Sequence, residues 1–305
     1  MIAKKANIKS NFRREISTYP RARDAWQAVL EAYKSKHPSA KVVLPSYIGW
    51  TITEGSGIFD PVTNAGMPFD FYALDKRLRI NLDDLKEKVN NNTESVVLLV
   101  HYFGFPDERY EEITNWLDEN GVFYIEDAAH GMMSDLIGNS CGRRGAFSFF
   151  SLHKNLPLPD GGMLVDNGRY SLEIEHTDYM DSKAIFSYDI HGIYAKRREN
   201  YQVLVDQLND VDGIELLYPE LDENVSPQSC PILIKNKNRD DIFKAMNDNG
   251  FGLVSLYYHM IEPLRETAYE SANYTSKHIT NLPVHQDCKA SELIKLTEYL
   301  KELIA

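Results

Sequence analysis

The stretch GAFSFFSLHKNLPLPDGGMLV, Gly145–Val165, places a lysine between two apolar runs. Phe147–Phe150 is almost continuously apolar, which is typical of a strand covered on both faces. Two prolines and a Gly-Gly pair follow the lysine, and they restrict the backbone and allow close approach to a neighbouring segment. The stretch therefore predicts two strands joined by a stiff loop that holds Lys154 near the end of the first strand.

Similar apolar runs alternate with helical patterns from about residue 20 to residue 165. The expected strands lie within residues 41–47, 95–104, 122–129, 145–151 and 161–166. The expected helices lie within residues 22–36, 81–89 and 107–121. This alternation predicts an α/β fold with three layers, in which helices cover both faces of a mostly parallel sheet.

The pattern changes after about residue 190. A long amphipathic helix is expected within 193–211, followed by strands within 213–218 and 230–235 and helices within 239–250 and 290–304. We therefore expect a large domain at 1–190, with an N-terminal tail at about 1–17, and a smaller α+β domain at 191–305.

Composition restricts the class of protein. The 305-residue chain is 43% hydrophobic and has a formal net charge of −12, which argues against a groove for nucleic acid. Its three cysteines have no C-x-x-C spacing, so neither a disulfide framework nor a zinc site is indicated. No apolar run approaches the roughly 18 residues of a membrane span, and the N-terminus lacks a signal-peptide pattern. We expect a cytoplasmic protein without a membrane partner.

Four polar residues follow apolar runs: Tyr47, His101, Asp127 and Lys154. Ligands of open α/β sheets collect beyond the carboxyl ends of the strands, so these side chains are candidates for a site. A lysine removed from water has a lowered pKa and can form a Schiff base with an aldehyde. A carboxylate can keep a pyridine nitrogen protonated. Together, Lys154 and Asp127 indicate pyridoxal phosphate chemistry.

Simpler interpretations remain for these residues. An exposed loop lysine and a turn aspartate are common. Asp127, His130 and Asp135 could form a metal cluster, although no further ligand has a diagnostic spacing. His153 could assist proton transfer or simply pack, and His285 is expected to fix the turn into the last helix.

Several motifs together resemble one family. They are YPRARDAWQAVL, VVLPSYIGW, LLVHYFGFP, IEDAAHG, GAFSFFSLHKNLPLPDGGMLV, KRRENYQVLVDQL and NLPVHQD. Their order and approximate spacing are similar to those of the DegT/DnrJ/StrS family of pyridoxal-phosphate aminotransferases, from about residue 18 to the end. The resemblance implies a fold-type I aminotransferase architecture and a homodimer with active sites at the subunit interface.

The resemblance also implies residue roles. Lys154 matches the Schiff-base lysine and Asp127 the partner of the pyridine nitrogen. His130 and Tyr47 match residues that pack on opposite faces of the cofactor ring. His101 matches a motif position, which implies a place near the cofactor.

The cofactor phosphate has its own expected contacts. Ala22 and Arg23 match the start of a helix that holds the phosphate, and the N–H groups of a helix N-terminus favour an anion. One of Ser148 and Ser151 is expected to supply a hydroxyl to the same group.

The implied function is transfer of an amino group from glutamate to a nucleotide-linked keto-sugar, in surface-polysaccharide or amino-sugar biosynthesis. The segment after Gly162 is compressed, and the family's G-Y-N-x-R stretch is not visible there. Ala22 also replaces a glycine of the phosphate loop. Two alternatives stay open: a sugar dehydratase-type enzyme, in which histidine usually replaces the lysine, and a non-catalytic descendant that binds a ligand.

Overall fold

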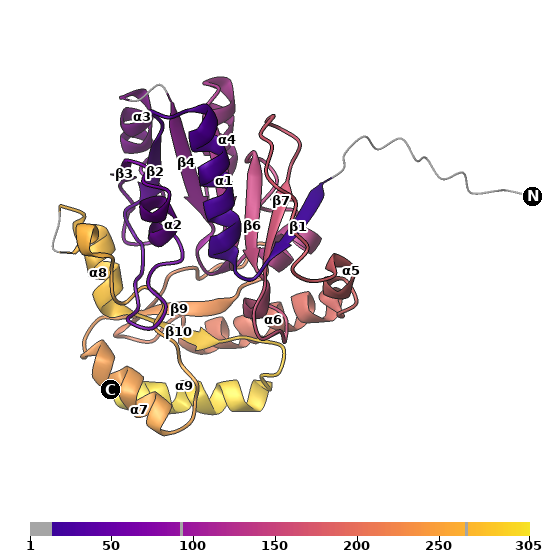
Figure 1. Cartoon of the computed structure of the whole chain (residues 1–305). Helices are drawn as coiled ribbons and strands as arrows, with labels where there is room; N and C mark the ends of the chain where they lie inside the picture. The colour runs from indigo at the N-terminus through magenta and orange to yellow at the C-terminus, as the bar shows by residue number, and fades with distance from the viewer. Residues whose placement is uncertain (1–13, 92–93, 266–267) are drawn as a thin grey trace, which may run out of the picture.

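The computed structural model describes residues 14–91, 94–265 and 268–305, and within them a seven-stranded sheet dominates (Figure 1). The strand order is β1-β7-β6-β5-β4-β2-β3. Strands β2 to β6 run parallel, whereas β7 and β1 are antiparallel to their neighbours. The strands are β1 (Glu15–Tyr19), β2 (Lys41–Pro45), β3 (Phe69–Tyr72), β4 (Ser95–Val100), β5 (Phe123–Asp127), β6 (Phe147–Ser151) and β7 (Gly162–Asp166).

Helices cover both faces of this sheet. They are α1 (Ala22–Lys36), α2 (Phe59–Asn64), α3 (Leu82–Asn90) and α4 (Tyr110–Glu119). Successive residues of a strand point to opposite faces. Phe123 of β5 stacks on Tyr33 of α1, whereas its neighbour Tyr124 donates a hydrogen bond to Asp118 of α4. Helices α1 and α4 therefore lie on opposite faces, which confirms the predicted three-layer arrangement.

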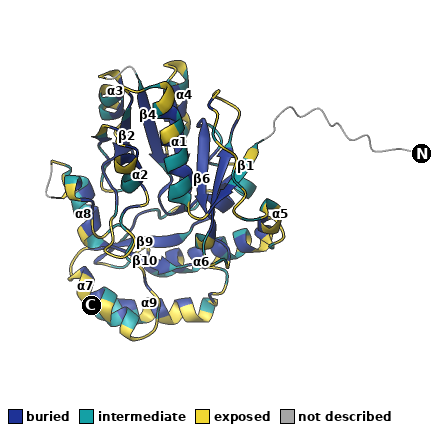
Figure 2. Cartoon of the chain, viewed as in Figure 1, coloured by how far each residue is buried: buried dark blue, intermediate teal, exposed yellow. Residues whose placement is uncertain are grey.

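Burial explains why these segments form strands. Every residue of β5 and β6 is buried, and the dark central strands contrast with the exposed outer sides of the helices (Figure 2). On α1, Trp26 is fully buried and stacks on Phe149 of β6. The apolar side of α1 thus packs on the face of the sheet to which Phe149 points.

A second sheet lies below the first in Figure 1 and has the order β10-β9-β8. Its strands are β8 (Ile214–Leu216), β9 (Ser229–Ile234) and β10 (Ile279–Pro283), with helices α6 (Ile190–Leu208), α7 (Arg239–Asp248) and α9 (Ala290–Ile304). We propose that the domain boundary lies at residue 190, because α6 begins there and all three strands of the small sheet follow it. The expected tail overlaps β1, which begins at Glu15; residues 1–13 lie outside the described residues.

Several elements had no sequence prediction. They are β1, β3, β10, α2, α5 (Ser182–Ile185) and α8 (Glu270–His278), with the short turns η2 (Ser134–Gly138), η3 (Leu152–Lys154) and η4 (Glu262–Leu264). The strand expected within 95–104 ends at Val100, and its last residues form the turn η1 (Tyr102–Gly104). The last residue of η3 is the candidate lysine, so the stiff loop begins with a single helical turn.

Candidate cofactor site

Two neighbouring parallel strands bring the predicted catalytic residues to one edge of the large sheet. Asp127 is the last residue of β5, and Lys154 lies three residues beyond the end of β6. Asp127 pairs in register with Phe149 of β6, so β6 continues two residues beyond the end of β5, to Ser151. His130 follows β5 in a short turn, and its Nε2 lies 2.9 Å from Nζ of Lys154.

The hydrogen bonds of His130 bear on the protonation state of Lys154. The backbone N–H of Phe103 donates to Nδ1 of His130 over 3.1 Å, so Nδ1 carries no proton. A neutral imidazole has a single N–H, which must then be on Nε2 and donate to Nζ of Lys154. An ammonium group has no lone pair to accept this hydrogen bond. A hydrogen bond in this direction therefore requires the uncharged form of Lys154.

Burial favours the same protonation states. It lowers the pKa of Lys154, and the negative charge of Asp127 only partly opposes that shift. Burial also lowers the pKa of His130 well below its usual value, and the nearby positive charge that Lys154 can carry adds to the effect. A lysine with a lowered pKa is a better nucleophile near neutral pH.

Asp127 is buried and keeps part of its hydrogen-bonding capacity free. Burial raises its pKa, while the N–H of Ala129 (2.9 Å to Oδ1) and the positive charge that Lys154 can carry act in the opposite direction. Within the part of the chain that the structure describes, Oδ2 receives no hydrogen bond. Such an oxygen can accept the N–H of a protonated pyridine ring.

Helix α1 begins beside this site. Its N-cap, Arg21, is extended and supplies no side-chain cap. A Cβ at Gly162 would lie 2.3 Å from the carbonyl carbon of Arg21, so the glycine at the start of β7 lets the two segments pack closely. The positive charge of Arg23 contributes, after burial, to the lowered pKa of Lys154. The start of α1 with Ala22 and Arg23 therefore lies near the lysine, as an anion site would require.

The two candidate serines point to opposite faces of β6, because they lie an odd number of positions apart. Ser151 shares a face with Phe149, and thus with Asp127 and α1; its Oγ lies 3.5 Å from Nδ1 of His153. Ser148 is buried on the other face and donates to the carbonyl of Gly142 over 2.5 Å. The structure therefore excludes Ser148 from the cluster and leaves Ser151 as the candidate.

Among the described residues, the ring of Tyr47 contacts Tyr257, and no ring contact with His130 is found. The side chain of Tyr47 is fully buried, and its hydroxyl has no hydrogen-bond partner among the described residues. The ring of Tyr257 lies 5.3 Å from that of Tyr47 and 6.2 Å from the imidazole of His130. Tyr257 therefore contacts both rings. No sequence pattern points to this residue, because its loop reaches the site only through the tertiary fold.

The side chain of His101 does not join the contacts of Lys154 and His130. His101 bonds to Glu126, with 2.6 Å between Nε2 and Oε2, on the face of β5 opposite to Asp127. Asp135 pairs with Arg14 (2.7 Å) and Arg143 (2.9 Å), so it does not converge with Asp127 and His130 on a metal. Among the described residues, no group of three His, Cys, Asp or Glu side chains is arranged to hold a metal ion.

Two other histidines are exposed. His153 is exposed beside Ser151, and His285 lies 3.5 Å from Asp287 on the surface. The carbonyl of His285 accepts a hydrogen bond from Asn200 of α6. This contact fits the structural role expected for the turn before α9.

Arg197 was not predicted, although it supports the lysine. It lies on the buried side of α6, and its guanidinium donates to the carbonyl oxygens of Lys154 and Gln228, each over 3.2 Å. Burial lowers the pKa of Arg197 to about 10. An arginine at a buried position of a helical pattern was the signal in the sequence that could have identified it.

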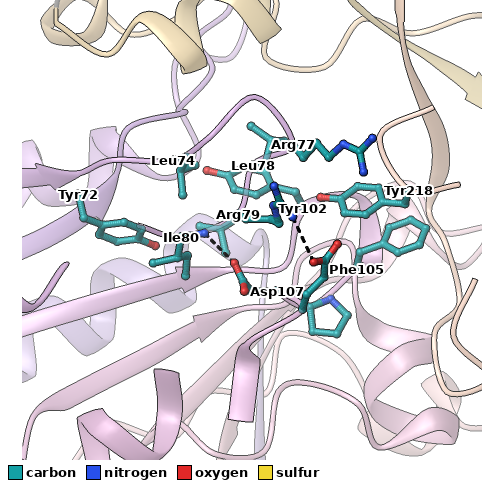
Figure 3. Close-up of a pocket in the computed structure, with 13 residues that line it drawn as sticks. Tyr72, Leu74, Arg77, Leu78, Arg79, Ile80, Tyr102, Phe105, Asp107 and Tyr218 are labelled. Carbon is teal, nitrogen blue, oxygen red and sulfur yellow. Dashed lines mark hydrogen bonds and ion pairs between the residues drawn. The ribbon is translucent and has the colours of Figure 1, made fainter. Parts of the chain in front are cut away.

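A small cavity beside the large sheet is separate from this cluster. It encloses about 10 Å³ and is lined by residues that include Tyr72, Asp107 and Tyr218 (Figure 3). Asp107 accepts a hydrogen bond from the N–H of Ile80 there. The volume suits about one water molecule, so this cavity is too small for a cofactor.

We find no helix in the described ranges with the length and apolar character needed to cross a bilayer.

Two curated relatives share part of the sequence. GDP-perosamine synthase of Vibrio cholerae is 32% identical over 93 residues, which are 30% of this chain and 24% of that protein. The dTDP-4-dehydro-2,3,6-trideoxy-D-glucose 4-aminotransferase of Saccharopolyspora spinosa is 33% identical over 129 residues, 41% and 31% of the two chains. The chain thus spans less than a third of the length of these relatives.

The fold is similar to solved structures over most of the chain. NtdA of Bacillus subtilis, solved with bound cofactor PMP, superimposes with a TM-score of 0.75 at 18% identity, covering 96% of this chain and 74% of that one. The sequence model of the DegT/DnrJ/EryC1/StrS aminotransferase family matches residues 24–175 and 189–301. Since the match covers most of the chain, the protein belongs to the DegT/DnrJ/EryC1/StrS aminotransferase family.

Proposed function

We propose that the protein is a pyridoxal-phosphate-dependent aminotransferase that acts on a sugar. Members of this family depend on pyridoxal phosphate. The observation that carries the proposal is the 2.9 Å contact between Lys154 and His130, because it suits an uncharged lysine amine close to the end of β6. An amine in this state can attack an aldehyde without first losing a proton.

The donor set of the site fits the cofactor. Asp127 has an oxygen free to accept the ring N–H, and His130 offers a flat, neutral side chain beside Lys154. Ser151 and the start of α1, with Ala22 and Arg23, are the proposed phosphate contacts, since uncapped helical N–H groups favour an anion. Asp127 thus suits the ring nitrogen, Lys154 the aldehyde, and Ser151 with the start of α1 the phosphate.

Pyridoxal phosphate, when bound, supplies an aldehyde and an electron sink for carbanion chemistry. Lys154 would carry the covalent link and, once released, move a proton at its Nζ as a general acid and base. Asp127 would hold a negative charge against the ring nitrogen. His130 would orient Nζ, since its Nε2–H is fixed by the Phe103 contact at Nδ1.

We propose a nucleotide-linked keto-sugar as amino acceptor and glutamate as donor. The names of both curated relatives contain a nucleoside diphosphate, and this supports the acceptor class. We further propose a cytoplasmic homodimer. The buried, unpaired cysteines are compatible with a reducing compartment. Exposed Trp50 and Ile52, in the loop that leads to α2, are suitable for contact with a second copy.

Two other activities are separable from this one. The presence of Lys154 argues against a dehydratase-type reaction, and the exposed position of His153 gives no substitute inside the site. A non-catalytic descendant would keep the fold and bind a ligand without turnover.

Absorbance distinguishes these possibilities. Purified protein mixed with pyridoxal phosphate should turn yellow, glutamate should bleach the colour, and a nucleotide-linked keto-sugar should restore it. Lys154→Ala should remain colourless, with Lys183→Ala, an exposed lysine, as the matched control. A yellow protein that no amino donor bleaches would favour the binding protein, and a yellow Lys154→Ala variant would contradict the assignment of the lysine.

A further inference from the structure

Tyr257 lies at the centre of a strap, residues 255–259, that is attached to both sheets. At one end, the N–H of Leu256 donates to Oδ1 of Asn281 in β10 over 3.1 Å. At the other end, the carbonyl of His259 accepts a hydrogen bond from the N–H of Trp50, which follows β2 (2.8 Å). The strap therefore holds Tyr257 between the small sheet and the carboxyl edge of the large one.

The side chain of Tyr257 faces the candidate cofactor site. Its ring lies 6.2 Å from His130 and 6.1 Å from Phe103. Burial raises the pKa of Tyr257, and the negative charge of Asp127 adds to this shift, so the phenol and the carboxylate are near each other. Tyr257 is only partly buried, whereas Tyr47 behind it is completely buried. Tyr257 is thus the aromatic residue at the surface of the site.

Gly49 provides the space for this ring. A Cβ at position 49 would lie 2.7 Å from Cδ1 and 3.0 Å from Cα of Tyr257. Real Cβ atoms do not approach another carbon at 2.7 Å, so any larger residue at position 49 would displace the tyrosine. The glycine and the tyrosine are therefore complementary in shape.

Building on the proposed function, we propose that Tyr257 forms the second wall of the cofactor-ring pocket, opposite His130, in the position expected for Tyr47. A ring packed between two others needs about 7 Å between them, twice the optimal carbon separation. The observed 6.2 Å requires Tyr257 to turn from its present 63° tilt and withdraw by about 1 Å. Movement of the strap would supply this adjustment.

One consequence concerns the small sheet. Because the strap is bonded to β10 as well as to the segment after β2, packing of Tyr257 on a ring restrains both sheets together. The cofactor should accordingly protect the strap from amide hydrogen exchange.

The test is the dissociation constant for pyridoxal phosphate, measured by quenching of intrinsic fluorescence. We expect Tyr257→Ala to weaken binding about tenfold, because an aromatic stacking contact is lost together with buried apolar area. Tyr257→Phe keeps the ring and should stay within about twofold of the unmodified protein. Gly49→Ala should weaken binding in the same direction, since the added Cβ displaces Tyr257.

Tyr258→Ala is the matched control. It removes a neighbouring tyrosine of the same strap that is 40% exposed and lies against Arg239, with 5.0 Å between the guanidinium carbon and the ring centroid. It should leave the dissociation constant unchanged. If Tyr257→Ala does not fold, Tyr257→Leu keeps most of the volume without the aromatic ring and should show the same weakening.

Each outcome has a defined meaning. Unchanged binding in Tyr257→Ala, with normal binding by the unmodified protein, would refute the role of Tyr257 in the pocket and leave the proposed function intact. Tighter binding would also overturn it, because Tyr257 would then compete with the cofactor ring. An unmodified protein that binds no pyridoxal phosphate would refute both the wall and the proposed function.

Discussion

Arg197 donates a hydrogen bond from its guanidinium to the backbone carbonyl of Lys154, over 3.2 Å, and so links α6 to the turn that carries the candidate lysine. The same side chain donates to the carbonyl of Gln228. Buried hydrogen bonds to charged groups are among the stronger ones in proteins. The position of the lysine thus depends on a residue 43 positions away along the chain.

Replacing Arg197 by methionine should loosen this turn. The carbonyl of Lys154 would lose a charged donor, so local opening should become about tenfold more frequent. Amide hydrogen exchange of the peptide that covers residues 152–161 would measure the change. Lys196→Met, one position earlier on α6 and paired with Glu199 at the surface, is the control and should leave exchange there unaltered. Equal exchange in all three proteins would contradict the link.

Glu126 should stabilise the fold as a buried carboxylate. It accepts hydrogen bonds from His101, Tyr110 and the backbone N–H groups of residues 142, 144 and 145. Burial alone would raise its pKa, but hydrogen bonds and the charge of His101 outweigh burial and lower the pKa to about 2. Glu126→Gln replaces one acceptor oxygen with an NH2 group, which cannot accept hydrogen bonds from these donors. The free energy of unfolding should therefore fall by about 3 kcal/mol at neutral pH.

The lowered pKa of Glu126 also predicts a pH dependence. The folded-state pKa of about 2 is below the ordinary 4.5, so the contribution of Glu126 is complete above pH 4.5 and is lost as the pH falls towards 2. Urea unfolding at several pH values should show this loss in the unmodified protein and a weaker slope in Glu126→Gln. The exposed Glu119→Gln is the control; an equal slope in Glu126→Gln would argue against the network.

Lys154 should react with pyridoxal phosphate at a lower pH than a free lysine side chain does. Burial lowers its pKa from the ordinary 10.5, so a larger fraction is uncharged at any given pH. The rate of chromophore formation should therefore rise with pH and level off below the midpoint of an exposed lysine. Nα-acetyl-lysine amide, whose side-chain amine is free, provides the reference. A midpoint equal to the reference would show that the amine is solvated and charged.

Ser151 and Ser148 form a matched pair on one strand. Ser151→Ala should weaken binding of pyridoxal phosphate about tenfold but hardly affect unphosphorylated pyridoxal, because only the phosphate contact is lost. Ser148→Ala should leave both affinities unchanged and lower stability, since Ser148 bonds to Gly142 inside the protein. Equilibrium dialysis with both ligands measures this, and a reversed ranking of the two serines would contradict the assigned faces.

The elements with periodic sequences were predictable, because the spacing of their apolar residues shows which side of each element is buried. The helices at 22–36 and 290–304 have the predicted bounds, since their apolar residues recur on one side. β1 and β10 were missed for physical reasons. β1 is a partly exposed edge strand that begins with Glu15, and β10 contains Asn281 and a terminal proline, both of which are uncommon in strands.

The proximity of Asp127 and Lys154 was predictable from the strands. Asp127 ends β5 and Lys154 follows the adjacent strand β6, so the topology brings them to the same edge. Ser148 and Ser151 are three residues apart on β6, so strand alternation by itself allows only one of them to face the site. Tyr47 could not be judged in this way, because the residue that covers it, Tyr257, comes from a loop more than 200 residues later in the chain.

The most direct test of the central claim is to find which lysine carries the cofactor. Reduction of the protein with borohydride in the presence of pyridoxal phosphate fixes the link permanently, and peptide mass spectrometry then locates the modified residue. We predict a single modification at Lys154, lost in Lys154→Ala. Modification of another lysine, or none at Lys154 under conditions where the protein is folded, would contradict the account.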